Sequence, residues 1–135
     1  GLLRSRSGPV TGEDGEPIAS RENAHAPSYT AAAHVTWRHP SGFFVRVDGT
    51  AMDDFYFDVP TDHDQKAGSH ALAHVKLGFE RGGWRVDAWV RNVFDRQYAV
   101  RGFFFGNDPR EGWENRLYRQ YGDPRHFGVT ASVQF

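Results

Sequence analysis

Arginine and aromatic residues suited to ligand binding gather in the stretch from residue 96 to residue 120. This stretch contains Tyr98, Arg101, Phe103, Phe104, Phe105, Arg110, Trp113, Arg116, Tyr118 and Arg119. Guanidinium groups pair with anionic chelates, and aromatic faces stack on flat or cationic groups. We therefore expect a binding loop whose ligand contacts come from Arg101, Phe104, Arg110, Trp113, Tyr118 and Arg119. In the alternative, the aromatic residues fold the loop onto its support, and the arginines pair with Asp108, Glu111 and Glu114.

Histidine and aspartate residues offer little for a metal ion. His70 and His74 are four positions apart, so on one face of a strand roughly 13 Å separates them. That distance is too long for a shared metal, because Zn–N bonds are about 2.1 Å. Asp58, Asp62 and Asp64 lack the spacing and the distant glutamate of a calcium loop. We expect no metal site and no cofactor.

No residue pattern points to catalysis. The sequence has no serine in a Gly-x-Ser-x-Gly setting, no phosphate-cradling glycine loop and no cysteine. Neighbouring carboxylates such as Asp53 and Asp54 alternate across a strand and cannot act together. We therefore expect that this protein is not an enzyme. Its net charge of −1 gives no electrostatic reason to expect a nucleic-acid partner.

Apolar and polar residues alternate along much of the chain, which is the period of a β-strand. Five stretches show this alternation: 30–38, 43–57, 70–80, 84–94 and 126–135. A sixth strand is expected to end near Leu3. The pattern predicts an all-β protein built as an antiparallel β-meander.

The connections between these strands alternate in length. Residues 39–42 and 81–83 are tight turns, whereas residues 8–27, 58–69 and 95–124 are long and polar. Short turns at one end of a meander and long loops at the other are typical of a transmembrane β-barrel.

Aromatic residues mark both ends of the apolar strand faces. The expected membrane girdle contains Tyr29, Trp37, Phe43, Phe55, Phe79, Trp84, Phe94, Phe127 and Phe135, with Phe57 on the same side. The two belts are roughly 19–28 Å apart along a membrane normal, close to the apolar band of about 25 Å in such barrels. We expect Val86, Val90, Val129 and Val133 to point outward from a single curved sheet. The alternative is a soluble β protein whose aromatic residues pack a core.

Two motifs in the second half of the chain carry a family resemblance. The run from Trp89 to Tyr98 contains Asn92, Phe94 and Asp95, and it resembles the penultimate-strand signature of TonB-dependent outer-membrane receptors. The run from Tyr121 to Arg125 contains Gly122 and Pro124, and it is similar to the segment that opens the last strand in that family. With a proline-started strand at residues 26–30, the resemblance covers roughly residues 21–135. From the residues themselves, we expect structural roles: Asn92 and Asp95 hydrogen-bond loop backbone, and Pro124 lacks an N–H where a ladder starts.

The resemblance implies that residues 1–135 are the C-terminal segment of a 22-stranded barrel, without its plug domain and earlier strands. It implies a receptor in the bacterial outer membrane that imports a scarce ligand, often a ferric siderophore, with energy from the TonB complex. Implied partners are outer-membrane lipid and lipopolysaccharide, the TonB complex through the missing N-terminal part, and the barrel-assembly machinery through the strand ending at Phe135. The rival interpretation is a soluble, secreted β-sandwich that binds a carbohydrate through exposed aromatic residues.

Overall fold

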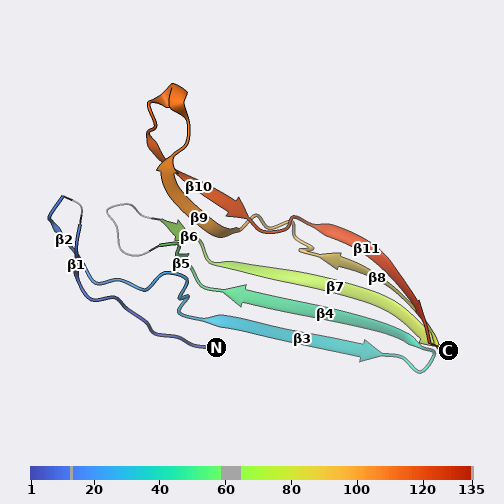
Figure 1. Cartoon of the computed structure of the whole chain (residues 1–135). Helices are drawn as coiled ribbons and strands as arrows, with labels where there is room; N and C mark the ends of the chain where they lie inside the picture. Colours follow the sequence, from blue (N-terminus) through green and yellow to red (C-terminus); the bar gives the residue numbers. More distant parts are fainter. Residues whose placement is uncertain (13, 59–64, 135) are drawn as a thin grey trace. The chain divides into compact units, whose positions relative to one another are not determined.

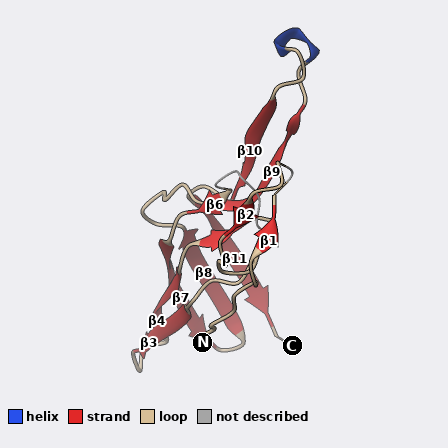
Figure 2. Ribbon diagram, turned by 90° about the vertical axis from the view of Figure 1, so that its left-hand side faces the viewer, coloured by secondary structure: helices blue, strands red, loops and turns tan. Residues whose placement is uncertain are grey.

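The structure, a computed structural model, describes the chain except for residues 13, 59–64 and 135. The described residues form antiparallel β-strands and one short 3-10 helix, Pro109–Glu111 (Figure 2). The strands are β1 Val10–Thr11, β2 Pro17–Ile18, β3 Thr30–Arg38, β4 Phe43–Met52, β5 Phe55–Tyr56, β6 Lys66–Ala67, β7 His70–Arg81, β8 Trp84–Arg91, β9 Ala99–Gly106, β10 Asn115–Tyr121 and β11 His126–Val133. None of the described helical segments has the length and apolar character needed to cross a membrane. The all-β, antiparallel prediction is confirmed.

The chain divides into two compact units. Unit 1 comprises Gly1–Thr30, Met52–His70 and Tyr98–Gly122. Unit 2 comprises Ala31–Ala51, Ala71–Gln97 and Asp123–Phe135. Most of each long strand predicted from the sequence falls in unit 2, whereas the long connections fall mainly in unit 1.

Unit 2 is one five-stranded sheet with the strand order β11-β8-β7-β4-β3 (Figure 1). β11 pairs with β8 from His126↔Arg91 to Val133↔Trp84, without a register shift. β8 also pairs with β7, and Val75 lies opposite Val90. The turn between β7 and β8 is made by Gly82 and Gly83 at φ 59° and 80°, a left-handed pair that matches the twist of a two-residue hairpin.

Two of the predicted strands are shorter than the sequence pattern suggests. β8 ends at Arg91 instead of residue 94, because Asn92 adopts φ 50° and leaves the extended conformation. The run predicted for residues 43–57 ends at Met52, and β5 begins separately at Phe55. Between them, the Asp53 amide donates to the Tyr29 carbonyl at 3.0 Å. After this bond, β5 pairs with β6 and not with a strand of the five-stranded sheet.

Unit 1 holds three small hairpins and a core of its own. β1 pairs with β2, β5 with β6, and β9 with β10. The core consists of Phe55, Phe57, Ala67 and Ala99, with Met52 and Leu117 packed against it. Thus the connections predicted as polar loops contain regular strands. The sixth strand expected near Leu3 is absent from the described residues, where Leu2 makes only an isolated bridge to Tyr29.

Candidate functional site

The predicted binding loop is largely a β-hairpin. β9 and β10 pair from Asn115↔Gly106 through Tyr118↔Phe103 to Gln120↔Arg101, with a bulge next to Tyr121. At its tip, the Asp108 side chain caps the 3-10 helix, and Gly112 closes it in the left-handed conformation. Trp113 follows with φ 61°, an uncommon value for a bulky residue. A sequence expected to be a loop is therefore a regular two-stranded support with a short irregular tip.

One face of this hairpin brings arginine and aromatic side chains together. Residues 101, 103 and 105 alternate onto one side of β9, where their direct partners are Gln120, Tyr118 and Arg116. The Arg101 guanidinium lies 4.7 Å from the centre of the Phe103 ring. The rings of Phe105 and Tyr118 are 5.2 Å apart. Phe103 and Phe105 are each 44% exposed and Tyr118 36%, so this aromatic–arginine face is open to a ligand.

The other residues predicted to contact ligand do not share this face. Phe104 and Arg119 belong to the opposite side of the hairpin, the side on which Gly102 packs against Phe57. Arg110 forms an ion pair with Asp108, whose carboxylate it contacts at 2.9 Å. Trp113 is exposed at the tip. Of the six residues predicted, only Arg101 and Tyr118 therefore lie together on the aromatic–arginine face.

The arginine pairing weighed as the alternative is partly present. Besides the Arg110–Asp108 pair, Arg116 contacts Glu111 at 2.7 Å. The hydrogen bond from the Arg110 side chain is the main cause that holds the pKa of the Asp108 carboxyl below its usual value. Arg101 has a ring contact but no ion pair among the described residues. Its charge is therefore the one on this hairpin face that a ligand could meet directly.

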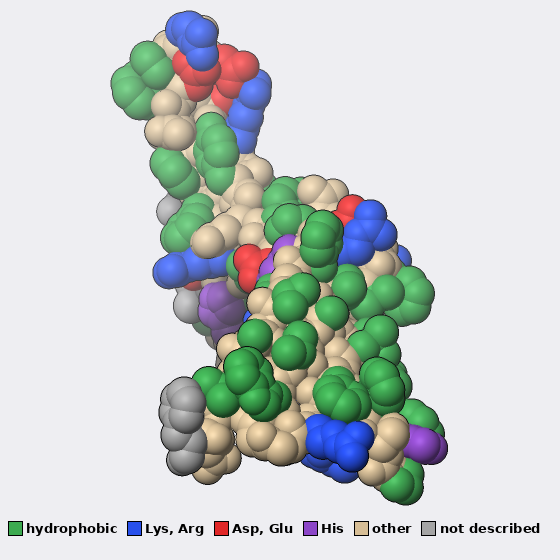
Figure 3. Space-filling view, turned by 90° about the vertical axis from the view of Figure 1, so that its right-hand side faces the viewer, with side chains coloured by type: hydrophobic (Ala, Val, Ile, Leu, Met, Phe, Trp, Pro, Cys, Tyr) green, Lys and Arg blue, Asp and Glu red, His purple; other side chains and the backbone are tan. Residues whose placement is uncertain are grey.

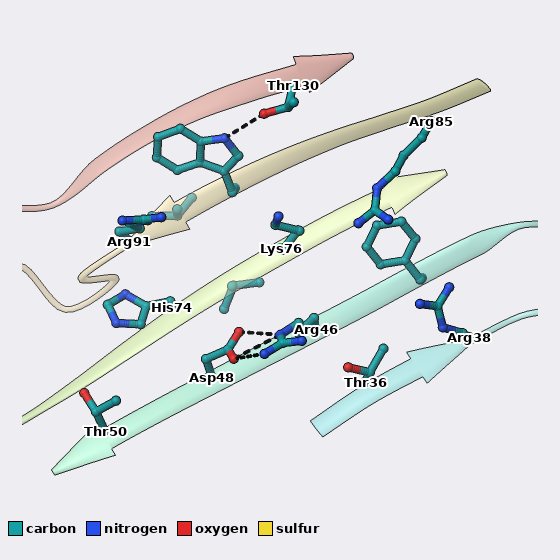
Figure 4. Close-up of a pocket in the computed structure, with 14 residues that line it drawn as sticks. Thr36, Arg38, Arg46, Asp48, Thr50, His74, Lys76, Arg85, Arg91 and Thr130 are labelled. Atoms are coloured by element: carbon teal, nitrogen blue, oxygen red, sulfur yellow. Dashed lines mark hydrogen bonds and ion pairs between the residues drawn. The ribbon is translucent and has the colours of Figure 1, made fainter. Parts of the chain in front are cut away.

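A second candidate surface is the polar face of the sheet in unit 2, shown in Figure 4. It is hollowed to about 770 Å³. The Arg46 guanidinium contacts Asp48 at 2.6 Å, and Arg85 contacts Asp87 at 3.1 Å. Lys76 approaches the same Asp87 carboxylate at 3.5 Å. These ion pairs balance the charges of this face, in which Asp87 is buried while Arg46, Lys76 and Arg85 stay partly exposed.

Two aromatic residues, Phe44 and Trp89, lie on this polar face, and the sequence analysis did not single them out. Phe44 is buried above Gly78, where an added Cβ would come within 2.3 Å of its ring. Trp89 lies over Gly128 in the same way, at 2.5 Å, and its indole N–H donates to Thr130 at 3.3 Å. A signal was available in both cases, because each aromatic residue interrupts a polar series and faces a glycine on a neighbouring strand. Only the strand register shows which glycine.

The opposite face of the sheet is apolar and uncovered. Val129 is 72% exposed, and Val86 and Val133 are also exposed, while Val90 is half-buried. Several aromatic rings on this side are equally open, among them Trp37, Phe43, Trp84 and Phe127. Figure 3 shows hydrophobic side chains gathered on the surface around the tight turns. The prediction that the valines are not enclosed by a second protein layer is confirmed.

Three girdle residues behave differently from the exposed ones. Phe55 was predicted to face outward, but it is 6% exposed in the core of unit 1, as is Phe57 at 5%. The break after Met52 explains this error, because β5 pairs with β6 and turns both rings inward. Phe79 is half-buried, with its ring 4.9 Å from that of Phe43. Phe135 lies outside the described residues.

The remaining girdle and motif residues lie at strand ends. Tyr29 is 40% exposed beside the start of β3, and Phe94 is 78% exposed in the turn after β8. In unit 1, the ring of Tyr98 stacks on His70 with centroids 4.6 Å apart. Gly122 lies against the Tyr98 ring, which leaves no room for a larger residue.

Asn92 and Asp95 hydrogen-bond loop backbone, as expected. The Asn92 amide group donates to the carbonyls of Arg96 and Asp123 at 2.9 and 3.0 Å, and its oxygen accepts from the Arg96 N–H. The Asp95 carboxylate accepts from the Arg125 N–H at 2.8 Å. These bonds join the chain after β8 to the chain before β11. They give the two residues a structural role that does not involve a ligand.

Metal binding finds no support in the described part of the chain, where no group of three His, Asp or Glu residues could hold an ion. Asp62 and Asp64, two of the three aspartates considered for calcium, lie outside the described residues. The chain was also compared with known proteins. No protein-family model matches it, and no solved structure matches it.

Proposed function

We propose that this chain is part of an outer-membrane receptor barrel that imports a scarce ligand, a ferric siderophore in the resembling family, with energy from the TonB complex. The observation that carries the proposal is the uncovered apolar face of the sheet in unit 2, opposite a face of ion pairs. In water, such a surface is unfavourable by about 25 cal/mol for each Å². Hydrocarbon removes that penalty, and a watery interior suits the charged face.

The arrangement of the aromatic residues supports the same proposal. Trp37, Phe43 and Trp84 lie beside the tight turns, while Phe94 and Phe127 lie at the other strand ends. Transmembrane barrels carry girdles of aromatic residues at both interfaces, and the indole rings of Trp37 and Trp84 also favour the boundary between lipid and water. A β-sandwich would instead bury one face of this sheet against a second sheet. The exposed fraction of 72% at Val129 is what a lipid-facing position would have.

The hairpin β9–β10 is the proposed ligand contact in unit 1. Its aromatic–arginine face, formed by Arg101, Phe103, Phe105 and Tyr118, offers rings for stacking and the Arg101 guanidinium, which has no ion pair with another described residue. Uptake of a panel of ferric chelates should be compared between the intact receptor gene and a version without residues 99–118. Unchanged binding and uptake after this deletion would exclude the hairpin as the ligand contact.

The membrane location can be tested with single cysteines, because the chain has none of its own. Val129 and Thr130 are neighbours on β11 that point to opposite faces. In two separate variants of the full chain, one of these residues is replaced by cysteine. The cysteine is labelled with an environment-sensitive fluorophore, and the labelled chain is reconstituted in lipid vesicles. We expect lipid-borne quenchers to act on the label at 129 and water-soluble quenchers on the label at 130. Equal access of the water-soluble quencher to both would refute the proposal.

A further inference from the structure

The polar face of unit 2 carries more positive than negative side chains. Its five cations are Arg38, Arg46, Lys76, Arg85 and Arg91, and its three carboxylates are Asp48, Glu80 and Asp87. The five cations do not share the three carboxylates equally. Glu80 lies between two guanidiniums, at 3.7 Å from Arg38 and 3.6 Å from Arg85. Arg91 has no carboxylate within ion-pair distance among the described residues.

Arg91 lies in a row of basic side chains that crosses three neighbouring strands. His126 on β11 is its direct partner across the strands. On the other side, β7 runs with Val75 opposite Val90, so the next position places His74 beside Arg91. Figure 4 shows the side chains of His74 and Arg91 at the same end of the hollow. These three side chains include no acid; the carboxylate that interacts with His74 is Asp48 on β4, which is already paired with Arg46.

The hydrogen bonds around His74 decide which of its ring nitrogens faces a ligand. The Asn92 backbone N–H points at His74 Nδ1, 3.1 Å away. A backbone amide can only donate, so Nδ1 is the acceptor and carries no proton. The proton of the neutral ring is therefore on Nε2, which makes this nitrogen a donor. Next to it, Arg91 adds the planar donor fork of its guanidinium.

The indole of Trp89 completes the site. The Arg91 guanidinium lies 5.7 Å from the centre of this ring, which supports the side chain without neutralising it. The Trp89 N–H donates to the Thr130 hydroxyl oxygen, which holds the indole in place. The hollow thus presents a guanidinium and an imidazole N–H as donors at one end, whereas Thr130 lies opposite Asp87, four residues along β11 from the His126–Arg91 pair.

We propose that this end of the polar face, formed by His74, Trp89 and Arg91, is a binding site for a small oxyanion with carboxylate or phosphate oxygens. Donors without matching acceptors are the arrangement that such oxygens need. The placement of the site on a transport route rests on the proposed function, because only in a barrel would this face line the interior. Anion binding itself does not depend on that placement.

Trp89 reports on the site directly, because the other three tryptophans lie elsewhere: Trp37 and Trp84 on the apolar face, and Trp113 at the hairpin tip. The full chain with these three changed to Phe is placed in micelles of a non-ionic detergent. It is then titrated with inorganic phosphate while sodium chloride keeps the ionic strength constant. We expect a saturable change in Trp89 emission. A strictly linear response, or none, overturns the site.

Two substitutions remove one arginine each from the same sheet. Arg91→Gln should weaken the apparent phosphate affinity about tenfold or more, because a charge-assisted hydrogen bond is lost. Arg81→Gln removes an exposed arginine from β7 on the side away from the polar face. It should change the apparent phosphate affinity less than about twofold. Equal effects of the two would mean that phosphate responds to total charge alone, which also overturns the site.

Circular dichroism shows whether Arg91→Gln folds. If it does not, fluorescence quenching of Trp89 in the chain that keeps Arg91 tests the site instead. Iodide and caesium are both collisional quenchers, but they carry opposite charge. Iodide should quench Trp89 more strongly than caesium, and phosphate should compete with iodide. Equal quenching would contradict the proposal. These micelle experiments can succeed when the vesicle labelling at Val129 and Thr130 fails, so a failure of the anion site and a failure of the membrane proposal are distinguishable.

Discussion

The two units of this chain differ in which side chains they bury. Unit 1 consists of three separate two-stranded sheets, yet it buries Phe55, Phe57, Ala67 and Ala99 together. Unit 2 has long and regular strands, yet its buried side chains among the described residues are Phe44, Asp87 and Asn92. The first unit is organised around a small core of its own. The second has regular hydrogen bonding and no core.

This difference shows that regular strand pairing alone does not bury apolar surface. The inner strands β8, β7 and β4 of unit 2 pair on both sides, and β11 and β3 pair on one, but a single layer leaves both faces open. The polar face offsets this exposure with ion pairs, whereas the apolar face leaves Val35, Leu77 and Val129 more than half exposed. Such a sheet needs a covering medium, and unit 1 does not. The substitutions below test this contrast.

The largest effect is expected in the core of unit 1. Phe57→Ala should destabilise this unit by about 3–5 kcal/mol, because Phe57 is 5% exposed and its ring packs on Gly102. Amide hydrogen exchange should accelerate in β5, β6 and β9. Leu2→Ala, at a residue of the same unit that is 92% exposed, is the control and should change little. If both substitutions had equally small effects, unit 1 would have no independent core.

The second effect separates the two faces of unit 2. Val129→Arg places a charge on the apolar face and should destabilise the chain in lipid vesicles by about 2–4 kcal/mol. Thr130→Arg, one residue further along β11, places the same charge on the polar face and should cost much less. Urea unfolding of the reconstituted chain, followed by tryptophan fluorescence, measures both. A reversed order would mean that the apolar face does not meet hydrocarbon.

The third effect concerns the end of β8. Asn92→Ala should cost about 1–3 kcal/mol, because the carbonyls of Arg96 and Asp123 lose their donor in a buried place. Asn92→Asp keeps an oxygen for the Arg96 N–H and tolerates the positive φ, but it places a second acceptor oxygen against the carbonyls of Arg96 and Asp123 in a buried place. It should therefore be at least as harmful as Asn92→Ala. Thermal unfolding of the three chains gives the order, and a melting temperature of Asn92→Asp equal to that of the parent chain would show that the two donated hydrogen bonds are unimportant.

The contrast between the units also explains what the sequence could predict. Alternation alone identified the five long strands of unit 2, because one face is apolar and the other polar along most of their length. It failed in unit 1, where the consecutive residues Phe103, Phe104 and Phe105 hide the alternation of β9. It also failed at Phe55, which continues the apolar series of β4 although the chain has already left that sheet.

The candidate sites, like the fold, could be predicted only in part from the sequence. The composition of residues 96–120 identified the hairpin as a binding candidate, but not which side chains share a face. That information depends on the β9–β10 register, which places Tyr118 opposite Phe103 and moves Phe104 to the other side. The row of His74, Arg91 and His126 was not predicted, since it comes from three strands whose pairing has no signature in any one of them.

The smallest expected effect concerns the tip of the hairpin in unit 1 and depends on pH. Asp108 accepts hydrogen bonds from the Arg110 side chain and backbone, which lower its pKa. The pKa of the folded state is below that of the unfolded state, so the stabilisation is present at neutral pH. It is lost only as the pH falls through the lowered value in acid. The Asp108 side chain is partly exposed, so solvent screens its interaction with Arg110. The loss of stability in acid should therefore stay confined to the tip of the hairpin.

An NMR titration of the Arg110 amide measures this effect. In the parent chain, its chemical shift should move with a midpoint below the ordinary range of an aspartate, and Asp108→Asn should abolish the transition. Asp14→Asn is the matched control, because Asp14 accepts the Glu16 N–H but has no arginine in ion-pair contact. A transition that persisted in Asp108→Asn would assign the titration to another group. The cap would then stabilise the tip by its backbone geometry, and the contrast between the units would rest on the Phe57 core alone.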